Sequence, residues 1–224
     1  MTYDEPDLRR SVVETCQAMQ RKGLVKGTSG NVSVRIDGGF LISPTGVPYE
    51  TLEPGQVVRM RWDGTVKGCM TPSSEWRFHR DILKRRADLN AIVHTHSMHA
   101  AAVSVLGHEI PPIHYRIAAA GGPNIRCAGY AMFGTQELAD LAVAAMEGRR
   151  ACLLAHHGVI AAHSSLAGAL NVAEVVEELA TLYLLCLPMG KPPQLSADAI
   201  AKVIERHKTY GQQPHEEKAA PAGR

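Results

Sequence analysis

Two pairs of histidines are the residues of this sequence best placed to do chemistry. His94 and His96 lie two residues apart at the end of a predicted strand, so both side chains leave the same face and can converge on one metal ion. His156 and His157 follow a second buried apolar segment, and either can reach the same end of the sheet. Three neutral imidazoles with an open position are typical of a catalytic divalent metal site. For His94 and His96 alone, the alternative is a buried pair satisfied by backbone carbonyls.

Glu75 is the best candidate for an acid/base. It follows a Pro-Ser-Ser turn and opens a predicted helix, where it can face both an anion and a metal. The alternative is purely structural, because an acidic residue in the first helical turn complements the helix dipole. His79 on the same helix and His99 on the next one are expected at the surface or in supporting positions.

Three turns carry hydroxyl or amide side chains and can present backbone N–H groups to a phosphate. They contain no lysine or arginine, so a phosphate would be held mostly by neutral donors. The three turns are Gly30-Asn31, Thr45-Gly46 and Ser73-Ser74.

Hydrophobic periodicity predicts the elements that position these residues. Hairpin signals in the first third of the chain favour antiparallel pairing, and residues 111–123 are expected to form an irregular connection. We predict one α/β domain with helices flanking a largely antiparallel sheet, and residues 212–224, which are polar and aperiodic, are expected to be a disordered tail. Helices are predicted over 6–22, 76–86, 97–106, 135–147, 166–187 and 196–204, and strands over 32–36, 40–42, 57–60, 91–96, 151–155 and 159–162.

Composition excludes several classes of function. The formal net charge is +2 and the basic residues are scattered, so neither nucleic acid nor another polyanion is expected as a partner. The apolar segments are far shorter than the ~18–20 residues of a membrane span. No secretory signal opens the chain, which predicts a cytoplasmic protein. The five cysteines include no Cys-x-x-Cys pair, as expected for reduced thiols.

Eight motifs, in order along the chain, are similar to those of the class II aldolase/adducin family, and most similar to those of its L-fuculose-1-phosphate aldolases. The resemblance implies a three-layer α/β/α domain over residues 1–211, with a largely antiparallel central sheet. The motifs are Gly27-Thr-Ser-Gly-Asn-Val-Ser33, Leu41-Ile-Ser-Pro-Thr-Gly46, Pro72-Ser-Ser-Glu-Trp-Arg-Phe-His79, Val93-His-Thr-His96, Ile113-His-Tyr115, Tyr130-Ala-Met-Phe-Gly-Thr135, Leu153-Leu-Ala-His-His-Gly158 and Lys208-Thr-Tyr-Gly211.

The resemblance implies a metal centre that holds one Zn²⁺ per subunit, although another divalent metal is possible. His94, His96 and His157 match the zinc-binding histidines, which selects His157 over His156. Glu75 matches the acid/base, which also ligates the resting zinc.

The same resemblance assigns the substrate-binding residues. Tyr115 matches a tyrosine that acts on the aldehyde oxygen from a neighbouring subunit. Phe133 and Tyr210 match aromatic residues of the aldehyde pocket, and His207 stands where similar aldolases carry an aromatic residue. The family forms homotetramers with active sites between subunits. The residues that match the phosphate-binding turns are Gly30, Asn31, Thr45, Gly46, Ser73 and Ser74.

The implied activity is reversible cleavage of a deoxyketose 1-phosphate, such as L-fuculose 1-phosphate, to dihydroxyacetone phosphate and a small aldehyde such as lactaldehyde. Three alternatives stay within the enzyme class: an aldolase for 5-deoxyribulose or 5-methylthioribulose 1-phosphate, a phosphopentulose epimerase, and a dehydratase. A non-catalytic adducin-like module is a fourth, and the retention of every metal and phosphate motif argues against it.

Overall fold

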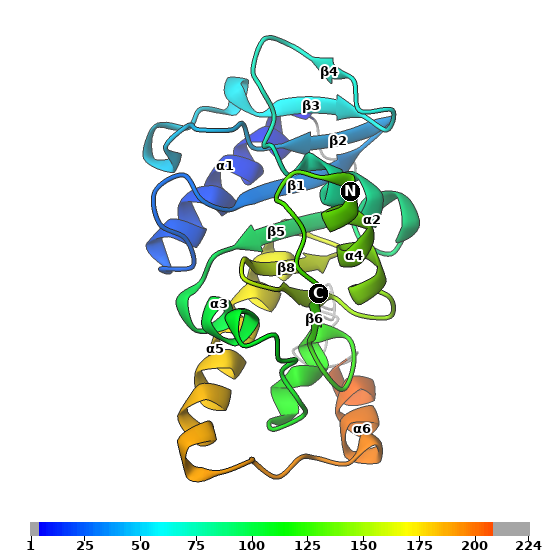
Figure 1. The fold of residues 1–224 in the computed structure, drawn as a ribbon. Coiled ribbons are helices and arrows are strands. Elements are labelled where there is room, and N and C mark those ends of the chain that lie inside the picture. Colours follow the sequence, from blue (N-terminus) through cyan, green and yellow to red (C-terminus); the bar gives the residue numbers. More distant parts are fainter. Residues whose placement is uncertain (1–4, 208–224) are drawn as a thin grey trace, which may run out of the picture.

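Strands form the centre of the computed structural model, which describes residues 5–207 (Figure 1). They make one sheet in the order β4-β3-β2-β1-β5-β8-β7-β6. Every neighbouring pair is antiparallel except β6 with β7. The strands are β1 (Asn31–Ile36), β2 (Gly39–Ile42), β3 (Val58–Arg61), β4 (Val66–Lys67), β5 (Ala91–Thr95), β6 (Arg126–Ala128), β7 (Ala151–Leu154) and β8 (Gly158–His163).

Helices cover both faces of this sheet. α1, α3 and α5 contribute to the core on one face, whereas α2 and α4 contribute to the core on the other. The helices are α1 (Glu5–Arg21), α2 (Trp76–Arg85), α3 (Met98–Val105), α4 (Gln136–Ala145), α5 (Leu166–Cys186) and α6 (Ala197–His207), with short 3-10 segments η1 (Tyr49–Thr51), η2 (Pro54–Gln56), η3 (Tyr115–Ala120) and η4 (Leu187–Met189).

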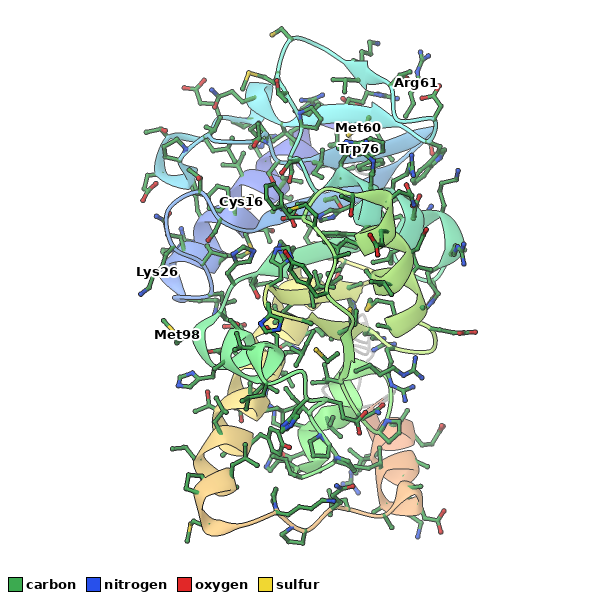
Figure 2. All side chains as sticks on the ribbon, viewed as in Figure 1. Cys16, Lys26, Met60, Arg61, Trp76 and Met98 are labelled. Carbon is green, nitrogen blue, oxygen red and sulfur yellow. The ribbon has the colours of Figure 1, made fainter. Side chains whose placement is uncertain are left out.

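Residues of β5 alternate between the two cores, because successive side chains of a strand point to opposite faces. Val93 packs in the core that contains α1 and α5, and Ile92 packs in the core that contains α2 and α4. Met60 of β3 is buried in the second core, and Trp76 at the start of α2 packs against it (Figure 2). The predicted fold, a largely antiparallel sheet between two layers of helices, is confirmed.

The segment between α3 and α4, which includes the irregular connection predicted for residues 111–123, also contains a strand that the sequence did not predict. β6 pairs in parallel with β7, so that Cys127 lies opposite Leu153. η3 forms earlier in the same segment. A strand of three residues is too short for period-two alternation to be visible, and β6 exists because the edge of β7 offers it a partner.

Part of the sequence prediction lies outside the described residues, namely Tyr210 and the tail 212–224. The final helix of the described chain begins at Ala197, after Ser196, whose hydroxyl accepts a hydrogen bond from the Ala199 N–H as predicted for a helix start. Within residues 5–207, none of the helices combines the length and the apolar character needed to cross a membrane.

α5 offers a matched test of this packing. Leu179→Ala should lower the free energy of unfolding by about 2–5 kcal/mol, because Leu179 is fully buried beneath the sheet and its truncation leaves a cavity. Leu185→Ala on the same helix removes a side chain that is 67% exposed, and should change stability by no more than about 0.5 kcal/mol. Denaturant unfolding of the two variants measures the difference, and equal losses would contradict the packing described.

Candidate active site and metal centre

Strand pairing brings the two histidine pairs to the same end of the sheet. His94 lies on β5, and His96 follows the last residue of that strand. β8 runs antiparallel to β5 with Val159 opposite Thr95, so the turn that carries His157 meets the end of β5. Glu75 comes from another direction, as the N-cap residue of α2.

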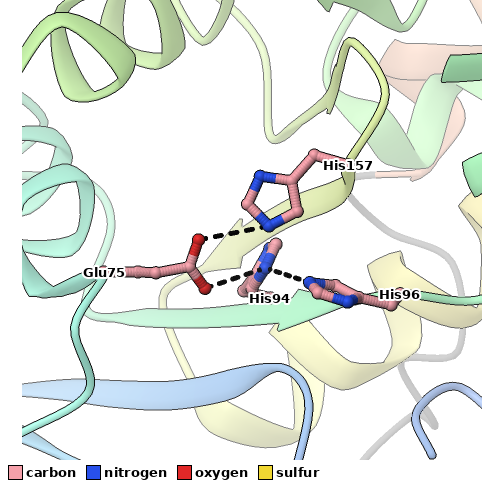
Figure 3. A group of neighbouring side chains, drawn as sticks. All are labelled: Glu75, His94, His96 and His157. Atoms are coloured by element: carbon pink, nitrogen blue, oxygen red, sulfur yellow. Dashed lines mark hydrogen bonds and ion pairs between the residues drawn. The ribbon is translucent and has the colours of Figure 1, made fainter. Parts of the chain in front are cut away.

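Four side chains converge at this point, with one ligand atom of each lying within 4.8 Å of the others (Figure 3). The Nε2 atoms of His94 and His96 are 2.9 Å apart. Glu75 Oε2 lies 3.2 Å from His94 Nε2, and Glu75 Oε1 lies 3.2 Å from His157 Nε2. The spacing of His94 and His96 therefore does place two ring nitrogens together, and Glu75 and His157 complete the group.

The donor set fits a metal ion. His94 Nδ1 lies 2.8 Å from the Val159 carbonyl oxygen and donates to it, which leaves the lone pair of Nε2 directed at the cluster. Glu75 Oε1 is buried without a hydrogen-bond partner. Lone pairs that face one another repel unless a cation lies between them. Three imidazole nitrogens and one carboxylate oxygen form a ligand set typical of zinc.

Electrostatics at the cluster favour the ligating forms of these groups. Burial opposes charge on Glu75, but the neighbouring His94 and His157 outweigh it, so the pKa of this carboxyl lies well below its usual range. Burial, with His94 and His157 close by, lowers the pKa of His96 to about 3. The cluster therefore holds a carboxylate, and His96 is a neutral imidazole at neutral pH.

Two glycines allow the backbone to approach the metal ligands closely. A Cβ at Gly158 would lie 2.3 Å from the Thr95 carbonyl oxygen and 3.0 Å from the His96 ring. Gly30 has a φ of +78°, and its Cβ would lie 2.6 Å from the His94 carbonyl oxygen. Larger residues at either position would push β5 away from its neighbours.

His156 stands apart from the cluster, although it is adjacent to His157. It is exposed, and its backbone has a φ of 57°. Among the described residues, no other residue except glycine has a positive φ. Its ring lies 6.1 Å from that of Tyr130, centroid to centroid. The left-handed backbone turns the two neighbouring histidines in different directions, so the structure brings only His157 to Glu75.

Two of the three predicted phosphate turns are joined side by side. Pro44 and Pro72 form an isolated β-bridge, which holds Thr45-Gly46 beside Ser73-Ser74. The Ser73 N–H donates to the Ser43 carbonyl, and the Ser73 hydroxyl accepts from the Glu75 N–H at 3.3 Å.

The third turn, Gly30-Asn31, joins the same group. The Asn31 side-chain N–H donates to Glu75 Oε2 at 2.9 Å. Tyr49 supports this turn from below, because its hydroxyl donates to the Gly30 carbonyl at 2.7 Å. Asn31 therefore contacts the carboxylate of Glu75, whereas Ser73 contacts the backbone N–H of the same residue.

His79 is the residue near the site that sequence reasoning missed. It is fully buried, and its ring lies 2.7 Å from the Ser33 hydroxyl and 2.5 Å from the Asn31 side-chain oxygen. Burial lowers its pKa to about 3. A usable signal was present, because His79 is four residues after Glu75 and so lies on the same face of the helix.

Comparison with known proteins assigns the family. Residues 10–184 match the profile described as the Class II Aldolase and Adducin N-terminal domain. The chain belongs to the class II aldolase/adducin family. The resemblance predicted from the eight motifs is therefore confirmed.

Individual members of the family are similar over nearly the whole chain. The chain is 50% identical over 205 residues to the L-fuculose phosphate aldolase of Escherichia coli (strain K12), which covers 91% of this chain and 95% of the relative. It is 48% identical over 204 residues to the 5-methylthioribulose-1-phosphate/5-deoxyribulose-1-phosphate aldolase of Rhodospirillum rubrum. The match covers 91% of this chain and 92% of the relative. A solved L-fuculose 1-phosphate aldolase superposes with a TM-score of 0.88 at 36% identity, covering 93% of this chain and 98% of the other.

Of the residues assigned to the aldehyde side by the family resemblance, the structure describes the side chains of Tyr115 and Phe133, and both are exposed. Tyr115 begins η3 and is 53% exposed, and Phe133 is 61% exposed. The loop that carries Phe133 packs closely against the Ser73-Ser74 turn, since a Cβ at Gly134 would lie 2.8 Å from the Ser74 carbonyl oxygen. His207 ends α6, and its side chain, like Tyr210, lies outside the described part of the chain.

Burial of His79 predicts a pH-dependent stability. Below about pH 6.5 the unfolded chain protonates this residue, whereas the folded chain does so only near pH 3. The unfolded state then binds more protons, so lowering the pH costs wild-type protein about 1.4 kcal/mol of stability per pH unit from this group. His79→Gln should lack that part of the slope.

Denaturant unfolding of both proteins with a metal chelator, at about pH 7 and about pH 5, measures the slopes. The chelator removes metal from both proteins, and the other titrating groups are common to both, so their contributions cancel in the comparison. Parallel pH dependences would show that His79 titrates normally in the folded chain.

Proposed function

We propose that this protein is a zinc-dependent class II aldolase that reversibly cleaves a deoxyketose 1-phosphate, such as L-fuculose 1-phosphate, to dihydroxyacetone phosphate and a small aldehyde such as lactaldehyde. The observation that carries the proposal is the convergence of Glu75 with His94, His96 and His157 beside the Asn31 turn. A non-catalytic adducin-like module would have no need of a buried carboxylate with three histidine rings around it.

The metal would be held by three histidines, with Glu75 as a fourth ligand in the resting state. Breaking the bond between C3 and C4 leaves negative charge on the three-carbon fragment, and Zn²⁺ supplies the Lewis acid that offsets such charge. His94 is orientated for this role by its hydrogen bond to the Val159 carbonyl. His157 lies 14% exposed at the open side of the cluster, where a substrate would enter.

The substrate phosphate would lie against the three turns, where N–H and hydroxyl donors replace lysine and arginine. Asn31 and Ser73 contact Glu75 directly, so a phosphate bound there would place the adjoining carbons beside the carboxylate. Glu75 would carry the proton on the enediolate carbon of dihydroxyacetone phosphate, a role worth about 10²–10⁴-fold in rate. In the direction of cleavage the C4 hydroxyl would release a proton as the aldehyde forms, and the protonated Glu75 carboxyl would give one to the enediolate carbon, so that no net proton is gained or lost.

The aldehyde end of the substrate would be completed by a second copy of the chain. Exposure of Tyr115 and Phe133 supports this arrangement, because large aromatic side chains left in water are typical of surfaces that another subunit covers. In the homotetramer that the family implies, Tyr115 would act on the aldehyde oxygen of a neighbouring site. Phe133, His207 and Tyr210 would line the pocket.

A second substrate is supported by the comparisons. The Rhodospirillum rubrum relative is 48% identical, against 50% for the Escherichia coli relative, so overall identity barely separates their substrates. The two kinds of ketose phosphate share the phosphate end and differ at the distal end. The pocket around His207 would decide between 5-deoxyribulose or 5-methylthioribulose 1-phosphate and L-fuculose 1-phosphate.

Release of dihydroxyacetone phosphate tests the proposal. Zinc-loaded protein should cleave L-fuculose 1-phosphate and 5-deoxyribulose 1-phosphate with kcat/KM values within roughly two orders of magnitude, because small changes in an apolar pocket discriminate weakly. Glu75→Gln should lose about 10²-fold or more of kcat, since an amide cannot take up the proton. A coupled assay for dihydroxyacetone phosphate measures both. Absence of cleavage of every ketose 1-phosphate by wild-type protein would refute the aldolase assignment.

Metal analysis tests the ligand set. His157→Asn should lose stoichiometric zinc, whereas His156→Asn should keep it and retain turnover, because the backbone at His156 directs that ring away from the cluster. The two substitutions are chemically identical and adjacent, so each is the control for the other. Zinc retained in the first variant and lost in the second would reverse the assignment.

A further inference from the structure

Four buried polar side chains form one hydrogen-bonded chain that ends on the proposed acid/base. Ser33 lies 2.7 Å from His79, His79 lies 2.5 Å from the Asn31 oxygen, and the Asn31 nitrogen lies 2.9 Å from Glu75 Oε2. Ser33 and His79 are fully buried, and Asn31 is 3% exposed. Water therefore cannot replace a missing partner within this chain.

The charge on Glu75 determines the direction of every bond in it. A carboxylate only accepts, so Asn31 must turn its N–H toward Glu75 and its oxygen toward His79. That oxygen also only accepts, so His79 must carry its proton on Nε2. Nδ1 is then a lone pair, and the Ser33 hydroxyl donates to it. The reverse order would place the Asn31 carbonyl oxygen 2.9 Å from the carboxylate, where the two repel.

We propose that His79 is a positioning residue, whose Nε2–H holds the Asn31 amide in the one orientation that serves both Glu75 and the substrate phosphate. This inference rests on the proposed function, which assigns Asn31 to the phosphate turn and Glu75 to proton transfer. The Asn31 nitrogen carries a second N–H, which the described contacts leave available to a ligand. His79 thereby links the two halves of the proposed reaction, phosphate binding and proton transfer.

The imidazole is itself held rigidly. Its ring stacks on Phe78 with the centroids 4.6 Å apart, and Phe78 lies edge-on to His94 at 5.3 Å. Ser33 and Asn31 are two residues apart on β1 and point to the same face, so the strand presents both partners to one ring. An asparagine amide has oxygen and nitrogen ends of nearly equal shape, so packing alone cannot choose between its two orientations. The charge on Glu75 and the His79 proton make that choice together.

Nitrogen-15 NMR of histidine-labelled, zinc-loaded protein tests the bond direction without any substrate. His79 should show the neutral tautomer with the proton on Nε2, and the assignment comes from loss of its signals in His79→Gln. A proton on Nδ1, or a charged ring at neutral pH, would overturn the inference. This result does not depend on whether the protein cleaves a sugar phosphate.

Three substitutions then separate positioning from packing. The amide nitrogen of His79→Gln can reach the position of Nε2 and keep the bond to Asn31, whereas His79→Asn reaches only the position of Nδ1 and His79→Phe has no donor. We expect kcat to fall roughly tenfold in the Asn and Phe variants and within about threefold in Gln, as for loss and retention of one buried hydrogen bond. Zinc content should stay stoichiometric in all three, and exposed His108→Gln is the surface control.

A double-mutant cycle gives the decisive comparison. If His79 acts through Asn31, then adding His79→Phe to Asn31→Ala should cost almost nothing beyond Asn31→Ala alone. The same tenfold loss in both backgrounds would show a merely structural role and overturn the inference, as would equal activity of the Gln and Asn variants. If wild-type protein cleaves no ketose phosphate, the proposed function fails, and the NMR result still decides the orientation of the chain.

Discussion

An ionised carboxylate held almost entirely out of water is the constraint on which the rest of this structure depends. Glu75 is 7% exposed, and a charge in that position is costly unless neighbouring groups replace the lost hydration. On one side the Asn31 amide donates to it, and on the other the ring nitrogens of His94 and His157 lie 3.2 Å away, where they could hold a cation beside it. Each of these partners is fixed by further contacts, so the stabilisation of one charge constrains the positions of several elements.

The sheet meets this requirement by bringing strands together that are distant in sequence. β5 lies between β1 and β8, so Asn31 of β1 is directly opposite His94, and Val159 of β8 accepts a hydrogen bond from the same histidine. Such close packing of backbone requires glycine at Gly30 and Gly158. The proposed metal ligand His94 therefore lies on a strand inside the sheet, and His96 follows the end of that strand, as accurate positioning of a catalytic group requires.

The inner part of the site, around Glu75, and the outer part, which carries Tyr115 and Phe133, differ in burial. In the inner part, Glu75, His94, Asn31 and Ser73 are buried, whereas Tyr115 and Phe133 of the proposed outer part are more than half exposed. A site of this kind can keep the chemistry at the metal constant while the residues facing the aldehyde change. Under the proposed function, that division would account for relatives with nearly equal identity to this chain that carry different substrate names.

The sequence by itself determined the features that depend on local order. Period-two alternation and turn residues predicted the hairpins, His94 and His96 were predicted to share a face, and the succession of motifs predicted the family. Tertiary structure decided the rest, because strand pairing and helix packing are not local. β6 forms only beside β7, and His156 is separated from His157 by a backbone angle that residue type does not specify. His79 was expected at the surface or in a supporting position, and it is buried because α2 lies over β1, where Ser33 and Asn31 offer the two partners that a neutral imidazole requires.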